Sequence, residues 1–248
     1  YYAGRYAAAC IANPGALIVM SLFAIADLHL SLETDKPMDV FSGWKDYVSR
    51  LEKNWRSVVT ENDTVVIGGD ISWAMKLQET YADFRFIHSL PGRKLLLKGN
   101  HDYWWCTKKK MDDFLYENGF NSMSILFNNA YAVDGYAVCG TRGWYYDAEN
   151  DADKKVLHRE VGRLKTSIEQ ARSLQLEPVV FLHYPPVYAN TPCKEIMDVL
   201  LHFGIRKCYY GHVHGGNAAK RAQIGVYAGI SFDLVACDYL KFMPRLIR

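Results

Sequence analysis

The sequence predicts an α/β fold in which two sheets pack against each other and helices cover the outside. Short apolar runs alternate with segments of helical apolar spacing in the first hundred residues, and further strand patterns follow in the second half. Half of the 248 residues are apolar and 23% are charged, which is ordinary for a globular protein with a substantial core. The number of expected strands fits two sheets better than one.

The first hundred residues alternate between strand and helix patterns. Strands are expected at 21–26, 64–67 and 94–98, where the apolar residues are continuous. Helices are expected at 44–59, where apolar residues recur at helical spacing, and at 78–90, which Pro91 ends. A βαβαβ order of this kind predicts a parallel sheet with right-handed crossovers.

The second half combines short strands with one long amphipathic helix. Helices are expected at 107–118, 152–174 and 194–203. Strands are expected at 124–127, 130–133, 136–140, 178–182, 207–210, 226–230 and 234–237. Asn128-Asn129 and Asp134-Gly135 are expected to form hairpin turns. Without repeats or a linker, we expect a single domain at 20–248 and an N-terminal extension at 1–19 that is not part of the fold.

Charge and cysteine usage limit the partners. A formal net charge of +2 gives no electrostatic footprint for nucleic acid, so a nucleic-acid partner is not expected. No apolar run approaches the roughly 20 residues of a membrane span. The six cysteines are scattered without a CxxC pair, which predicts free thiols and a cytoplasmic, reducing location. The oligomeric state is left open.

Polar residues cluster where the expected strands end. They are Asp27-Leu28-His29, Gly68-Gly69-Asp70, Gly99-Asn100-His101-Asp102, His183 and Gly211-His212-Val213-His214. Functional groups gather at the carboxyl ends of strands in α/β sheets, so these side chains are expected to meet. Carboxylates, imidazoles and an amide oxygen without a thiolate favour Mn, Fe, Zn or Mg over a structural zinc site.

This ordered set of motifs resembles the calcineurin-like metallophosphoesterase family, whose pattern is D-x-H, G-D, G-N-H-D/E, a lone H and G-H-x-H. The resemblance covers about 23–214. It implies a four-layer αββα sandwich of two mixed sheets flanked by helices, with two divalent or trivalent metal ions: Mn, Fe or Zn, with Mg possible. By the same resemblance, Asp27, His29 and His214 bind the first metal, Asn100, His183 and His212 bind the second, and Asp70 bridges both.

The implied reaction is hydrolysis of a phosphomonoester or phosphodiester in a small phosphorylated substrate. A hydroxide that bridges the metals would attack phosphorus in line with the leaving oxygen. His101 is not a ligand in the family pattern, and its implied role is to stabilise developing charge and protonate the leaving group. Two alternatives are a catalytically silent protein-binding scaffold and a lipid or nucleotide pyrophosphohydrolase. The lipid A pathway pyrophosphohydrolases, which the start Asp27-Leu28-His29-Leu30 resembles, rank lower because they have arginine where His101 stands.

Two departures from the family pattern affect the roles of individual residues. The acidic residue that often follows G-D is replaced by Ile71-Ser72-Trp73, so Asp102 becomes the leading candidate to orient His101. Protein Ser/Thr phosphatases carry arginine beside G-N-H. Tyr103-Trp104 occupies that place here, which disfavours protein phosphatase activity.

Three residues near the motifs are candidates for substrate contact. Arg142 lies in a loop after a strand and could bind a phosphate oxygen bidentately, or could equally form a surface salt bridge. Trp104 follows the central motif. Tyr184 follows His183, where it could stack on substrate, although Pro185 and Pro186 favour a role in fixing the loop.

Overall fold

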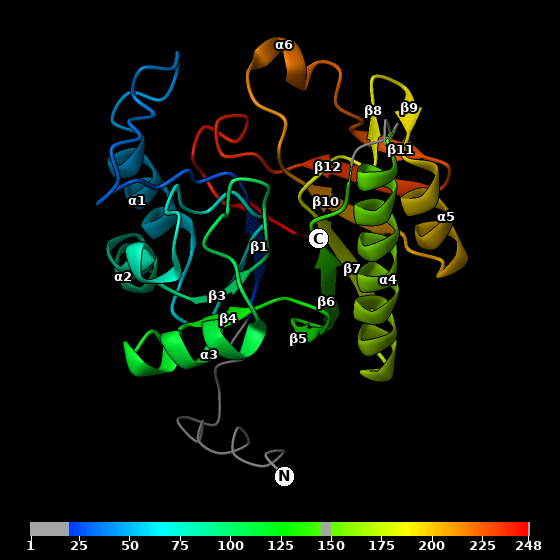
Figure 1. Cartoon of the computed structure of the whole chain (residues 1–248), viewed down its shortest axis with the longest axis horizontal. Coiled ribbons are helices and arrows are strands. Elements are labelled where there is room, and N and C mark those ends of the chain that lie inside the picture. The colour runs from blue at the N-terminus through cyan, green and yellow to red at the C-terminus, as the bar shows by residue number, and fades with distance from the viewer. Residues whose placement is uncertain (1–19, 145–149, 248) are drawn as a thin grey trace.

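The computed structural model describes residues 20–144 and 150–247 (Figure 1). The N-terminal extension expected at 1–19 lies outside the described residues. Two sheets stand next to each other with helices on both outer sides, which is the αββα arrangement (Figure 1). Among the described residues, no helix is both long enough and apolar enough to cross a membrane.

The first sheet has five strands in the order β13–β1–β2–β3–β4. Their bounds are Arg245–Leu246, Leu22–Ile25, Thr64–Ile67, Arg93–Leu96 and Met123–Ile125. Strands β1 to β4 are parallel, and β13 is antiparallel to β1. The helices that cover its outer face are α1 Tyr47–Val58, α2 Tyr81–Ser89, which follows the short 3₁₀ helix η1 Leu77–Thr80, and α3 Lys108–Glu117 (Figure 1).

The second sheet has six strands in the order β11–β12–β10–β7–β6–β5. Their bounds are Gly225–Tyr227, Ile230–Leu234, Lys207–Tyr210, Glu177–Leu182, Tyr136–Thr141 and Tyr131–Val133. The four central strands are parallel and both edge strands are antiparallel to their neighbours. Helices α4 Asp151–Ser173 and α5 Lys194–His202 cover its outer face. A short hairpin, β8 Val187–Tyr188 with β9 Thr191–Pro192, and the single-turn helix α6 Gly216–Ala219 lie in loops.

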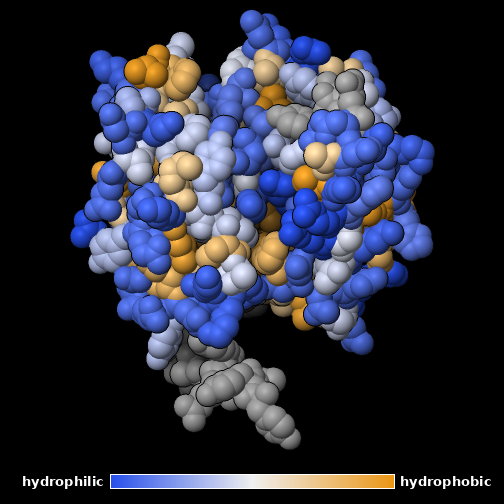
Figure 2. All heavy atoms as spheres, in the orientation of Figure 1, coloured by the Kyte–Doolittle hydropathy of each residue, from blue (hydrophilic) through white to orange (hydrophobic). Residues whose placement is uncertain are grey.

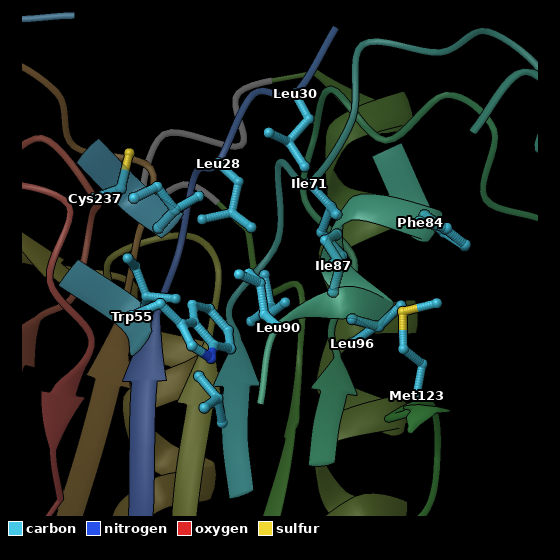
Figure 3. Packing of buried hydrophobic residues seen from close by; sticks show 14 of the residues in the cluster. Leu28, Leu30, Trp55, Ile71, Phe84, Ile87, Leu90, Leu96, Met123 and Cys237 are labelled. Atoms are coloured by element: carbon cyan, nitrogen blue, oxygen red, sulfur yellow. The ribbon is translucent and has the colours of Figure 1, made fainter. Parts of the chain in front are cut away.

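Three hydrophobic clusters occupy the three spaces between the four layers. Alternate residues of each strand face opposite sides: Phe23 and Ile25 point to the helices, whereas Leu22 and Ala24 point to the other sheet. Figure 3 shows part of the cluster beneath α1 and α2, where the Trp55 indole N–H donates to the Pro91 carbonyl (3.0 Å). Burial on both faces explains why these strands are continuously apolar in sequence.

The structure corrects the sequence predictions at two places. The turn expected at Asn128-Asn129 is not a hairpin, because β4 belongs to the first sheet and β5 to the second, so the chain crosses between sheets there. The strands expected at 226–230 and 234–237 are instead β11 and β12, a hairpin that turns at Ala228-Gly229. Both of these residues have positive φ, which allows this tight turn. The second strand therefore begins at Ile230, earlier in the chain than the predicted start at 234.

Candidate metal centre

The carboxyl ends of strands from both sheets meet at one edge of the molecule. The Asp27 N–H donates to the Gly69 carbonyl (2.8 Å), which joins the ends of β1 and β2. The His212 N–H donates to the Asp27 carboxylate (2.9 Å), which joins the second sheet to the first. The Gly211 N–H donates to the His183 carbonyl (3.1 Å). These bonds hold motifs that are up to 185 residues apart in one small region.

Four non-glycine residues of this region have left-handed backbone conformations. Asp27, His29, Asp70 and His212 have φ values of 63°, 45°, 49° and 68°. This region of φ is uncommon for residues other than glycine and costs of order 1 kcal/mol or more per residue. The loops that follow the strands turn sharply at these residues. Gly99 permits the close approach, since a Cβ there would lie 2.1 Å from an Asp70 carboxylate oxygen.

The first group of side chains is Asp27, His29 and His214. One ligand atom from each lies within 4.8 Å of the others. The Nε2 atoms of His29 and His214 are 3.3 Å apart, and His214 Nε2 is 3.5 Å from an Asp27 oxygen. Three donor atoms that face one another in this way can surround a single cation.

The second group is Asp70, His183 and His212, whose ligand atoms also lie within 4.8 Å of one another. Asn100 joins it through its amide oxygen, which is 2.7 Å from His183 Nε2 and 2.8 Å from His212 Nδ1. Asn100 was expected from the sequence at this position, and the structure brings it to the same two imidazoles.

Asp70 lies between the two groups. One carboxylate oxygen is 3.7 Å from His29 Nε2, and the other is 3.5 Å from His183 Nε2. The carboxylate is almost fully buried, with 1% exposure. It can therefore donate one oxygen to a cation in each group.

The protonation states of these groups suit cations. Burial lowers the pKa values of His29, His183 and His212 to about 3, so the rings are neutral and keep a lone pair for a metal. Burial, and then the charges of Asp27 and Asp102, hold the pKa of Asp70 well above its usual range. Divalent ions would offset this repulsion between buried carboxylates, so the donor set fits two of them.

The sequence predictions did not include Asp238, which contacts His214. An Asp238 oxygen lies 3.1 Å from His214 Nδ1, on the side of the ring opposite the first group. Although burial opposes it, the Asp27 and Asp238 carboxylates raise the pKa of His214 to about 10. Metal binding would therefore displace a proton from this ring. The sequence feature that could have indicated this contact is the position of Asp238, an acidic residue directly after the strand expected at 234–237.

His101 lies beside both groups without belonging to either. Its Nδ1 atom is 3.4 Å from the Tyr103 hydroxyl, and its ring centre is 4.5 Å from that of Trp73. The Trp73 indole also stacks on His29 at 4.9 Å. Trp73 and Tyr103 therefore hold the His101 ring near the site. The sequence did not predict these contacts.

The role expected for Asp102 is corrected. Its two oxygens accept hydrogen bonds from the backbone N–H groups of Gly99 (2.7 Å), Ile71 (2.8 Å) and Ser72 (3.3 Å) and from the Trp104 indole (3.1 Å). None of these bonds comes from the His101 ring. Asp102 instead holds the loops after β2 and β3 together, because a fully buried carboxylate needs several donors.

The three expected substrate residues have different environments. Trp104 is 2% exposed and packs on Phe84 in the core, so its prediction as a substrate contact is wrong. The Tyr184 ring is buried beside His212, with centroids 4.5 Å apart. The Arg142 guanidinium lies 3.6 Å from Glu160 and over the ring of Trp144.

Comparison with known proteins places the chain in a family. The family model described as calcineurin-like phosphoesterase matches residues 20–216. The chain belongs to this family. As a calcineurin-like phosphoesterase it is a metal-dependent enzyme that hydrolyses phosphoesters, and the two groups above are its candidate metal-binding residues.

Other proteins are similar to part or most of the chain. The chain is 43% identical over 58 residues to the Gene 66 protein of Mycobacterium phage L5, and this match spans 23% of the chain and 28% of that relative. The phosphopantetheinyl hydrolase PptH of Mycobacterium tuberculosis has a TM-score of 0.56 and 15% identity, with 92% of this chain and 95% of that chain covered. The protein of unknown function AQ665 from Aquifex aeolicus has a TM-score of 0.52 and 16% identity over the same shares.

Proposed function

We propose that this calcineurin-like phosphoesterase uses two metal ions to hydrolyse a small phosphomonoester or phosphodiester. Asp27, His29 and His214 hold one ion, Asn100, His183 and His212 hold the other, and Asp70 contacts both. The observation that carries this assignment is the position of Asp70, whose two oxygens lie 3.7 Å from His29 and 3.5 Å from His183.

Bound metal ions would supply Lewis-acid stabilisation of the phosphoryl oxygens and an acidified water. His101 donates a proton to the leaving oxygen and stabilises the charge that develops there. The Nδ1 atom of His101 contacts the Tyr103 hydroxyl (3.4 Å), which leaves the other ring nitrogen, Nε2, to donate the proton. Among the described residues, Nε2 of His101 has no hydrogen-bond partner and can face the substrate.

A small substrate is supported by two observations. The net charge of +2 provides no extended basic surface for a nucleic acid. One structural neighbour is named a phosphopantetheinyl hydrolase, so its named activity concerns a group that contains a phosphate ester. The choice between a monoester and a diester is left to experiment.

The direct test is hydrolysis of p-nitrophenyl phosphate and bis-p-nitrophenyl phosphate with added Mn²⁺ and measured metal content. We expect turnover of at least one substrate, loss of turnover with a chelator and recovery with Mn²⁺. Asp134→Asn, an exposed change in the β5–β6 turn, is the matched control and should keep full activity. Two bound metals with no turnover of either substrate would instead support the silent scaffold.

A further inference from the structure

We infer that Lys98 and Arg142, with Arg163 behind them, form a second anion subsite that binds an additional phosphate group of the substrate. The subsite lies beside the candidate metal centre, and the inference rests on the proposed phosphohydrolase function. It names the substrate class as a small organic molecule with two separated phosphate groups.

The two basic residues lie next to segments that carry proposed metal ligands. Lys98 follows β3 and precedes the Asn100 ligand by two residues, and Arg142 directly follows β6. The Arg142 carbonyl accepts the backbone N–H groups of both His183 (3.0 Å) and Tyr184 (2.9 Å). Lys98 therefore lies in the loop that carries Asn100, and the backbone of Arg142 is bonded to the segment that carries His183.

The local charge balance favours an anion. Lys98, Arg142 and Arg163 line one small hollow with a single carboxylate, that of Glu160. Three positive charges and one negative charge leave a formal excess of +2 among these described residues. Glu160 is 1% exposed and already binds the Thr141 hydroxyl (2.5 Å) and Arg163 (2.5 Å). One carboxylate cannot neutralise all three cations.

Arg142 and Lys98 have unused hydrogen-bonding capacity. The Arg142 Nε atom is buried and has no hydrogen-bond partner among the residues that the structure describes. Its guanidinium is 3.6 Å from Glu160, which is too long for a hydrogen bond. Lys98 is half-buried and makes no ion pair or hydrogen bond with any described residue. Asp102 attracts Lys98 electrostatically, but its oxygens are committed to four other donors.

Buried or half-buried charges without partners are costly, and an anion would remove that cost. The planar guanidinium of arginine matches two oxygens of a phosphate, and a lysine ammonium adds a point charge. The hollow has a volume of about 10 Å³, so a phosphate group would sit at its mouth. Figure 2 shows strongly hydrophilic side chains on this face in the middle of the molecule, beside α4.

The alternative is that Arg142 only fastens α4 to β6 through Glu160 and its stacking on Trp144 (4.8 Å). That role explains Arg142 but gives no reason for an unpaired, half-buried Lys98. Lys98→Met is therefore the decisive variant. It removes no ion pair from the described residues and should not impair folding.

The test compares two ligands that differ by one phosphate group: thymidine 5′-phosphate and thymidine 3′,5′-bisphosphate. Binding of each to the metal-loaded protein is measured by calorimetry. We expect the wild type to bind the bisphosphate at least tenfold more tightly. The preference should fall to less than threefold in both Lys98→Met and Arg142→Gln. Lys165→Met, an exposed change on α4, should keep the wild-type preference.

The subsite would be refuted if the wild type bound the two ligands equally well, or if both variants kept the wild-type preference for the bisphosphate. Hydrolysis of thymidine 5′-p-nitrophenyl phosphate is measured on the same samples. Absence of hydrolysis with the bisphosphate preference retained would contradict the phosphohydrolase function and still support the anion subsite. The two failures are thus distinguishable.

Discussion

The Nδ1 atom of His214 lies 3.1 Å from an Asp238 oxygen, while Nε2 of the same ring lies 3.5 Å from Asp27. A second Asp238 oxygen accepts the Gly215 N–H (2.8 Å), which fixes the carboxylate itself. Carboxylates that bind the far nitrogen of a ligating histidine set its orientation and increase its basicity. Asp238 therefore positions His214 for the proposed first metal.

Asp238→Asn should weaken binding at the first metal site roughly 10- to 100-fold, because an amide holds the imidazole less well than a carboxylate. The second site should keep its affinity. Calorimetric Mn²⁺ titration of the metal-free protein measures both sites, with Asp134→Asn as the matched exposed control. Equal weakening of both sites would argue against this role.

Asp70→Asn should impair both metal sites at once. Its two carboxylate oxygens face His29 and His183 in different groups, and an amide lacks the negative charge that holds two cations close together. The number of metal ions retained after gel filtration should fall from two to one or none. Retention of both ions would show that Asp70 is not shared.

His101→Ala should retain both metal ions and lose activity, because His101 contacts Tyr103 and Trp73 and belongs to neither ligand group. A general acid contributes roughly 10²- to 10⁴-fold. The loss should be largest for poor leaving groups, so phenyl phosphate should suffer more than p-nitrophenyl phosphate. If the variant loses a metal ion, His101 is a ligand and the assigned role is wrong.

Lys94 makes stability depend on pH. It is fully buried and donates to the carbonyls of Leu90 and His88, and burial lowers its pKa to about 8. The ordinary pKa is about 10.4, so the unfolded chain holds more protons than the folded chain between these values. The free energy of unfolding should therefore rise by roughly 1–3 kcal/mol as the pH rises from about 8 to about 10.4.

Urea unfolding of wild type and Lys94→Met at pH 7.5 and pH 10 measures this effect. The stability difference between the two proteins should shift in favour of the wild type at the higher pH. Lys53→Met, which changes an exposed lysine, should show no such shift. A pH-independent difference for Lys94→Met would contradict the altered pKa.

The sequence predicted the parts of the fold that depend on local patterns. Strand β2 at Thr64–Ile67 and strand β10 at Lys207–Tyr210 have the predicted bounds, because each is a short apolar run between polar turns. The metal-binding motifs could be found for a similar reason, since each follows such a strand directly. Their convergence within each sheet follows from the parallel order of the strands, and the packing of the two sheets brings both sets together.

Features that depend on contacts between distant segments could not be predicted. The sequence does not show that Asn128-Asn129 crosses between sheets, nor that β13 at Arg245–Leu246 pairs with β1. Asp102 was expected to orient His101 because no acidic residue follows Asp70 at 71–73. The donors of its hydrogen bonds instead include Ile71 and Ser72, from another loop.

The central claim is that two metal ions lie between these residues, with Asp70 shared. Anomalous diffraction from crystals loaded with Mn²⁺ tests it most directly. The predicted result is two peaks roughly 3.5–4 Å apart. One should lie among Asp27, His29 and His214, the other among Asn100, His183 and His212, with Asp70 between them. A single peak, or peaks outside these groups, would contradict the claim.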